Sequence, residues 1–351
     1  MSYYDGWILG ATKIIDHGPA WRRYNLAIIS EGYRPEEMTD FAEDAREFAE
    51  QLTSLPPLDD LDCAINVYRV DVASLESGAD DPTACGGTGA APRTFFDATF
   101  CGYGVRRIIL VNSGLVEWVA ATQVPEHHQV VVIVNSPLQG GSGGAFATVS
   151  NAATWPWARA AIHELGHSAF HLGDEYDFLT ACDDGNHTYA GPPPVEPNVA
   201  RDLGPALKWA DLVAPTTPLP TGSNPDCATC GTGPPSSPAG TVGAFEGAGY
   251  WHCGLYRPAH ACMMRDLSAF CPVCEREVRR VLAPFAPKCL APTFAGSRGW
   301  QCLIIVIALL IAALALAPFV WFGRTRCTLK RLAFRIQHCD TGNDDPCVEL
   351  G

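Results

Sequence analysis

The stretch Ala160–Asp177 reads AAIHELGHSAFHLGDEYD and contains two histidines four residues apart, His163 and His167. Four residues correspond to about 400° of α-helical turn, so both imidazoles would leave the same face of a helix, about 6 Å apart along its axis. Two such nitrogens can hold one Zn²⁺ at about 2.1 Å each. Glu164 lies beside this pair, where a carboxylate can hold a metal-bound water and accept its proton. The stretch therefore predicts a metal site on a helix rather than a solvent-exposed helix face on which the two histidines bind no metal.

The third protein ligand of this metal site must follow the histidine pair. On a continuous helix His171 would lie about 12 Å along the axis from His163, so three such side chains cannot converge on one ion. Gly173 can adopt a left-handed conformation and end the helix, which turns the next side chain back toward the metal. Asp174 is therefore the favoured third ligand, Glu175 is the second choice, and His171 is expected to pack near the site.

The same stretch resembles the metzincin signature, HExxHxxGxxH or the same pattern ending in Asp, with two differences. Phe170 stands where the turn-forming glycine is usual, and Asp174 comes one residue late. The variant with adjacent Asp and Glu is similar to the bacterial IgA metalloendopeptidase (IgA peptidase) family. The resemblance extends from Lys13 to Leu282, because three further segments are also similar to that family: AIISEGY, YRPAHACMMR and FCPVC.

The resemblance implies a zinc-dependent endopeptidase that acts on protein or peptide substrates. The expected cofactor is one catalytic Zn²⁺ held by His163, His167 and Asp174. The expected chemistry is hydrolysis of a peptide bond by a zinc-bound water that Glu164 activates. A catalytically inactive, membrane-anchored binding or adhesion module that keeps a metal-stabilised protease fold is the alternative. The presence of Glu164 favours the enzyme, since an inactive relative often lacks this base.

Further roles follow from the resemblance. A methionine is expected beneath the metal, and Met264 in CMMR is favoured for that position over a plain core role. A phenol could stabilise the developing oxyanion, and Tyr256 is selected for it, with Tyr250 as the other choice. The strand GAFATVS before the metal-binding helix is expected to be an edge strand that pairs with an extended substrate.

The order of the remaining segments indicates an α/β (α+β) fold with a mixed twisted sheet around a metzincin-like core, within a catalytic domain of residues 1–290. An irregular Pro/Gly-rich segment is expected from about 183 to 240, as part of an irregular C-terminal subdomain. The segments YNLAIIS, CAINVYRVDV, RRIILVN and QVVVIVN have the composition of strands. Helices are expected at Glu36–Leu55, Trp157–Leu172 and Glu275–Leu282.

The charge and the cysteines limit the classes of protein. The formal net charge is −14, which argues against a nucleic-acid binder because such proteins need a basic face. Fifteen cysteines favour an oxidising compartment. Two pairs of closely spaced cysteines are expected to form disulfides, with a second, structural Zn²⁺ site as the less favoured reading: Cys227, Cys230, Cys271 and Cys274.

A membrane anchor is expected near the C-terminus. Residues Leu303–Phe322 form about 20 uncharged, mostly apolar residues, enough to span a bilayer as one helix. A linker at 291–302 would precede it. The tail at 323–351 begins with basic residues, so the positive-inside rule places the tail in the cytoplasm and the catalytic domain outside. The N-terminus lacks the usual signal-peptide pattern, which argues against this orientation.

Overall fold

Strand β2 (Tyr24–Glu31) is buried along its whole length in the computed structural model, which describes residues 5–231 and 237–286. Its side chains alternate between the two faces of a sheet. Leu26 and Ile28 belong to one hydrophobic core, and Ala27 and Ile29 belong to another. A strand buried on both faces needs apolar residues at successive positions, which explains the run YNLAIIS.

Five further strands join β2 in one sheet: β1 (Gly6–Ile15), β3 (Ile65–Ser74), β4 (Gln129–Val134), β5 (Gly141–Ser142) and β6 (Ala147–Ser150). Their order is β1-β3-β2-β4-β6-β5. The four central strands are parallel to one another, whereas β1 and β5 run antiparallel to their neighbours at the two edges. The predicted mixed sheet is therefore confirmed.

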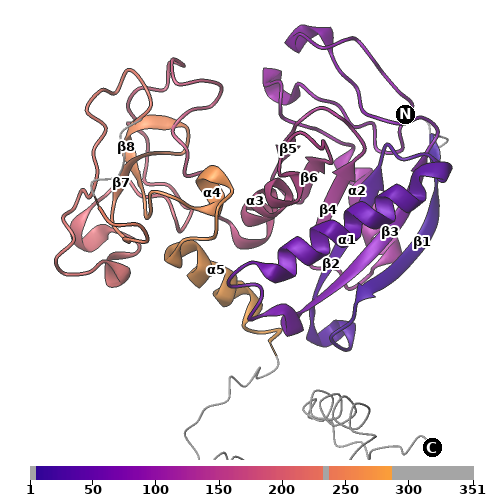
Figure 1. Ribbon diagram of the computed structural model, residues 1–351, viewed down its shortest axis with the longest axis horizontal. Coiled ribbons are helices and arrows are strands. Elements are labelled where there is room, and N and C mark those ends of the chain that lie inside the picture. Colours follow the sequence, from indigo (N-terminus) through magenta and orange to yellow (C-terminus); the bar gives the residue numbers. More distant parts are fainter. Residues whose placement is uncertain (1–4, 232–236, 287–351) are drawn as a thin grey trace, which may run out of the picture. The chain divides into compact units, whose positions relative to one another are not determined.

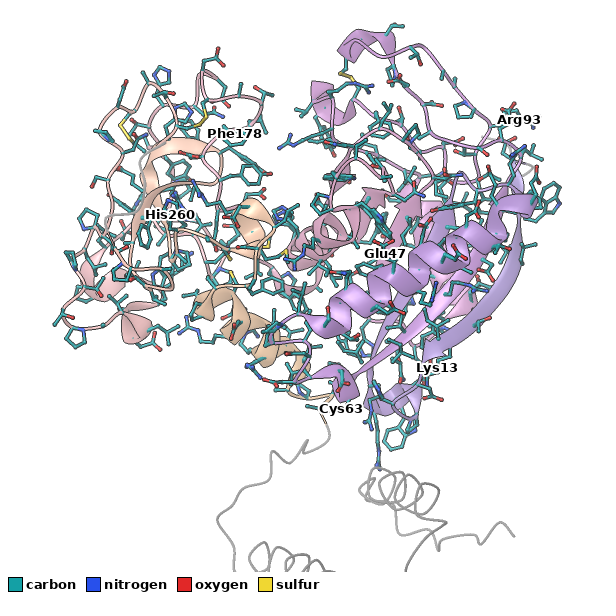
Figure 2. All side chains as sticks on the ribbon, viewed as in Figure 1. Lys13, Glu47, Cys63, Arg93, Phe178 and His260 are labelled. Carbon is teal, nitrogen blue, oxygen red and sulfur yellow. A yellow bond between two sulfur atoms is a disulfide. The ribbon has the colours of Figure 1, made fainter. Side chains whose placement is uncertain are left out.

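Helices cover both faces of this sheet (Figure 1). The helix α1 (Met38–Ser54) buries Phe41, Ala45, Phe48 and Leu52 at helical spacing, and it packs beside α3 (Trp157–Phe170) on one face. The opposite face is covered by α2 (Ser113–Gln123). The outer side of α1 is polar, with Glu47 exposed (Figure 2). This amphipathic pattern is what a helix on a buried sheet requires.

The described residues between 183 and 240 form no α-helix or strand beyond isolated bridges, as the Pro/Gly-rich composition predicts. They are tied to a hairpin of β7 (Phe245–Ala248) and β8 (Trp251–Arg257) by single bridges, such as Thr188 to Cys253 and Ala200 to Tyr256. Phe178 and His260 belong to the same half of the structure (Figure 2). The short helix α4 (Met263–Asp266) and α5 (Pro272–Leu282) follow and return the chain to α3.

Three disulfides join described residues: Cys85–Cys101, Cys182–Cys230 and Cys227–Cys253. Cys227–Cys253 ties the irregular segment to the hairpin, and Cys182–Cys230 closes a loop of that segment on itself. Disulfides persist in oxidising environments and are rare in the cytosol. They therefore indicate an extracytoplasmic location for this part of the chain.

Two predictions about strands are wrong. The segment RRIILVN forms no strand: Ile109 is buried in the core beneath α2, and Leu110 makes only one bridge, to Thr99. The segment GAFATVS supplies β6, which is not an edge strand because β5 pairs outside it. In both cases the local sequence has strand composition, but the neighbouring segments decide the pairing.

No helix among residues 5–231 and 237–286 is long and apolar enough to cross a membrane. The predicted linker 291–302, the predicted span Leu303–Phe322 and the predicted tail 323–351 all lie outside the described residues.

Candidate metal centre

The helix α3 carries both histidines of the predicted metal site. It is buried on nearly all sides, because β6 and α1 cover one side and α4 and α5 lie on the other (Figure 1). Such a helix needs apolar or small residues around its whole circumference, and the sequence WARAAIHELGHSAF supplies them. The packing fixes His163 and His167 on a rigid element.

The helix ends two residues before the predicted boundary. His171 adopts a left-handed conformation, with φ of 55° and ψ of 31°. The backbone N–H of His171 donates to the carbonyl of His167 at 3.2 Å and that of Leu172 to the carbonyl of Gly166 at 3.0 Å, which closes the last turn around a left-handed residue. The prediction that Gly173 makes the left-handed turn is therefore wrong. Gly173 instead allows close packing, because a Cβ there would lie 2.9 Å from Val199.

The turn at His171 brings Asp174 back to the two histidines. Oδ1 of Asp174 lies 3.0 Å from Nε2 of His163 and 3.2 Å from Nε2 of His167. The two Nε2 atoms are 3.2 Å apart. His163, His167 and Asp174 therefore form a triangle of potential ligand atoms, as predicted by the helix argument. His171 is exposed and lies outside this triangle.

Hydrogen bonds on the far side of each ring fix its orientation. Nδ1 of His163 lies 3.0 Å from the carbonyl of Met263, and Nδ1 of His167 lies 2.7 Å from the carbonyl of Leu172. A carbonyl can only accept, so each Nδ1 carries a hydrogen, and the neutral form of each imidazole directs its Nε2 lone pair at the triangle. This is the tautomer that a metal-binding histidine requires.

The triangle fits a small divalent cation. Bonds of about 2.1 Å at a tetrahedral ion place neighbouring ligand atoms about 3.4 Å apart, close to the separations of the Nε2 and Oδ1 atoms. Oδ1 of Asp174 has no other hydrogen-bond partner and is buried. The two histidines and the aspartate also match the nitrogen and oxygen ligands that Zn²⁺ accepts.

Charge within the triangle is tightly coupled. Burial opposes a positive charge on His167, but the Asp174 carboxylate outweighs burial and raises the pKa of His167 to about 9 when no metal is bound. Burial likewise disfavours the Asp174 carboxylate, yet the two imidazoles hold its pKa well below its usual range. The site therefore attracts positive charge, which can be protons or a metal ion.

Glu164 lies beside the triangle in a pocket of about 820 Å³. Burial raises the pKa of its carboxyl, as suits a group that exchanges protons near neutrality. The backbone of the edge strand runs directly past it: a Cβ on Gly141 would lie 2.8 Å from Oε1 of Glu164, and a Cβ on Gly143 would lie 2.7 Å from His167. Glycine at both positions lets another backbone approach the reactive groups.

Two tyrosines and an arginine line the pocket, and sequence reasoning missed two of the three. The hydroxyl of Tyr250 donates to Oδ2 of Asp174. The ring of Tyr176 stacks near His163, with 6.1 Å between centroids, and Arg107 donates to its hydroxyl at 3.3 Å. Tyr176 sits in the DEY stretch itself, whereas nothing in the sequence connects Arg107 with the site. Tyr256 lies on β8, with its backbone bonded to Ala200, and does not line the pocket.

The floor of the site is built from the turn around Met264. Its sulfur packs against α3 at Gly166, the residue before His167, since a Cβ on Gly166 would lie 2.5 Å from it. Met264 is completely buried, and its carbonyl accepts a hydrogen bond from the backbone of Glu175. The buried amide of Asn198 also holds this region, with three hydrogen bonds of 2.7–2.9 Å to Gly173 and Glu175. Asn198 had no recognisable sequence signal.

The family model for IgA Peptidase M64 matches residues 12–229 and 234–282, which is most of the chain. The chain belongs to this family. The protein is therefore a metalloendopeptidase, and the resemblance seen in the HELGHSAFHLGDEY stretch is confirmed. The search of curated proteins gave no match.

The four cysteines expected to act together are separated in this peptidase. Cys227 and Cys230 form disulfides with Cys253 and Cys182, respectively. Cys271 and Cys274 form no disulfide and lie in a different part of the structure, beside the free thiol of Cys262. The predicted Cys227/Cys230/Cys271/Cys274 zinc site is therefore wrong, and so is the prediction of disulfides for Cys271 and Cys274.

Proposed function

We propose that this M64 peptidase is a zinc-dependent endopeptidase whose catalytic ion is held by His163, His167 and Asp174. The observation that carries the proposal is the convergence of two Nε2 lone pairs and one carboxylate oxygen within 3.0–3.2 Å of one another. Three protein ligands leave a fourth coordination position open, as is usual in a catalytic rather than a structural site. When bound, the metal would act as a Lewis acid toward water and the substrate carbonyl.

Glu164 is the proposed general base. Its carboxylate faces the pocket next to His163 and His167, within reach of a water molecule at the open position. It would accept a proton from the attacking water and deliver it to the leaving amine. Burial raises its pKa, which makes the first of these transfers, acceptance of the proton from water, easier than for an ordinary exposed glutamate.

Tyr250, rather than Tyr256, is the proposed oxyanion stabiliser. Tyr250 lies in the pocket and its hydroxyl already donates to Asp174. A rotation of this hydroxyl toward the substrate would provide a hydrogen bond where negative charge develops on the carbonyl oxygen. Arg107 and Tyr176 line the same pocket and would help to orient the substrate.

The substrate is proposed to bind as an extended peptide along residues 143–145. These residues follow β5, are exposed and border the pocket beside His167. The N–H of Gly141 is already bonded to the carbonyl of Arg107, so the free edge begins after it. Main-chain pairing of this kind gives affinity without strict side-chain demands.

We further propose that Leu303–Phe322 anchors the enzyme to a membrane.

The test is an assay of casein cleavage by the full-length chain, with zinc measured on the same samples. Glu164→Gln should keep the zinc and lower kcat about 10²- to 10⁴-fold, the range usual for a lost general base. Glu47→Gln, the same change on the exposed side of α1, is the control and should leave kcat unchanged. Turnover near the wild-type rate in Glu164→Gln would remove this residue from the mechanism.

A further inference from the structure

A second group of buried ligand-type side chains lies behind the loop that carries Asp174. Its members are Glu175 and the three free thiols, Cys262, Cys271 and Cys274, each at most 4% exposed. One potential ligand atom from each residue lies within 4.8 Å of all the others. The group is distinct from the catalytic triangle, because Glu175 points away from the pocket that Asp174 faces.

The separations within this cluster match a tetrahedral site. Sγ of Cys274 lies 3.6 Å from Sγ of Cys262 and 3.2 Å from Oε1 of Glu175, and Sγ of Cys271 lies 3.9 Å from the same Oε1. Zinc–sulfur bonds of about 2.3 Å place tetrahedral ligand atoms about 3.7 Å apart. The thiols are too far apart for the S–S bond of about 2.05 Å, and one disulfide would in any case leave a third thiol unused.

The buried carboxylate of the cluster also favours a bound cation. Glu175 is fully buried, and its Oε2 has no hydrogen-bond partner. Among the described residues no lysine, arginine or histidine forms an ion pair with this carboxylate. A buried carboxylate without a counter-charge is strongly destabilising. A divalent metal would supply the charge and the missing partner together.

We propose that Cys262, Cys271, Cys274 and Glu175 bind a structural Zn²⁺ ion. Three sulfurs and one carboxylate oxygen fill all four tetrahedral positions, so no position remains for water or substrate. Zinc suits this mixed set because it accepts both thiolate and carboxylate ligands. Cys271 is the N-cap residue of the 11-residue helix α5 and Cys274 lies in its first turn, so both sulfurs stand at the positive end of the helix dipole.

The proposed ion would join three segments that build the floor of the catalytic centre. Glu175 adjoins Asp174, Cys262 adjoins the turn of Met263 and Met264, and Cys271 is the N-cap residue of α5. Glu175 is 96 residues from Cys271 in sequence, whereas Cys262 and Cys271 are nine residues apart. The ion would cross-link these segments and hold the Asp174 loop in place, as a disulfide can. A disulfide would use only two of the three thiols that meet here.

The experiment measures metal per chain on the full-length protein, loaded with Zn²⁺ alone and then with Co²⁺ alone. Wild type should bind two ions, and Asp174→Ala, which removes a catalytic ligand, should keep one. The Co²⁺ form of Asp174→Ala should retain the near-ultraviolet charge-transfer bands that thiolate ligands give. Cys271→Ser should lose these bands and one ion, whereas His171→Ala should keep both ions.

A Co²⁺ form of wild type without thiolate bands would overturn the proposal even if a variant fails to fold. So would peptide mapping that finds a disulfide between two of Cys262, Cys271 and Cys274 in the active enzyme. A catalytic centre without zinc would leave the thiolate bands unchanged, so failure of the catalytic proposal is distinguishable from failure of this one.

Discussion

The backbone N–H of Glu175 donates a hydrogen bond of 2.8 Å to the carbonyl of Met264. This bond joins the loop that carries the third metal ligand to the turn that lies beneath the two histidines. The next carbonyl toward the N-terminus, that of Met263, accepts from His163. The methionine turn therefore positions the metal site through its main chain as well as through the packing of its sulfur.

The first prediction concerns the third ligand. Asp174→Ala removes the only carboxylate of the triangle and should weaken zinc binding at the catalytic centre at least ~100-fold. Loss of a residue that only hydrogen-bonds to a metal ligand already lowers affinity by up to about that factor, and loss of the ligand itself should cost more. His171→Ala removes an exposed imidazole outside the triangle and should leave affinity unchanged. Zinc titration of both variants tests this, and loss of catalytic zinc in His171→Ala alone would contradict the assignment.

The second prediction concerns the edge backbone. Gly143→Ala places a methyl group 2.7 Å from His167, so the histidine or the edge must shift. We expect kcat/KM for casein to fall about 10²-fold, because small misplacements at a reacting centre have effects of this size. Gly144→Ala is the matched control, since no atom lies within 4 Å of a Cβ there. Equal activities of the two variants would show that the edge tolerates the shift.

The third prediction separates the two tyrosines. Tyr250→Phe removes a hydroxyl that lies in the pocket, and we expect kcat to fall about 10²- to 10³-fold with little change in KM. Tyr256→Phe removes a hydroxyl outside the pocket lining and should have no effect on kcat. Steady-state kinetics on both variants decide between them, and the reverse result would restore the original choice of Tyr256.

The fourth prediction concerns the support of the loop. Asn198→Ala removes three hydrogen bonds to Gly173 and Glu175, so the Asp174 carboxylate should lose its fixed position. Loss of such an outer partner typically lowers metal affinity about 10- to 100-fold. Zinc titration followed by circular dichroism separates this effect from unfolding. An unchanged affinity in a folded variant would mean that the loop is held by other contacts.

The fifth prediction concerns pH. The pKa of His167 is raised to about 9 in the metal-free site, so the ring is protonated below that pH and zinc must displace its proton. Apparent zinc affinity should therefore rise with pH up to about 9, by about tenfold per pH unit for each proton displaced. Titrations between pH 6 and about 9 measure this slope. A flat profile would mean that the imidazoles are already neutral without metal.

Sequence reasoning succeeded where local geometry determines the result. The spacing of His163 and His167 on a helix places their rings together whatever surrounds them, and a turn soon after the helix can return only the next few residues, among them Asp174. The continuous apolar run of β2 likewise requires burial on both faces. These features depend on short segments of the chain.

The failures concern contacts between distant segments. Left-handed geometry was assigned to Gly173 because glycine adopts it freely, yet the hydrogen bonds that end α3 place it at His171. Cys227 and Cys230 were grouped with Cys271 and Cys274 by their spacing, but their partners come from other parts of the chain. Arg107 reaches the pocket only because the sheet brings its loop there.

The disulfides of the irregular segment have a consequence for the survival of the enzyme. A peptidase that binds extended chains is a threat to any long, unstructured segment of its own molecule. The irregular segment is restrained by the disulfides Cys182–Cys230 and Cys227–Cys253 and by the bridges to the hairpin. These restraints oppose the extended conformation that binding in the active site of another molecule would require. We therefore expect the intact disulfides to slow autolysis and their reduction to expose this segment to cleavage by other molecules of the enzyme.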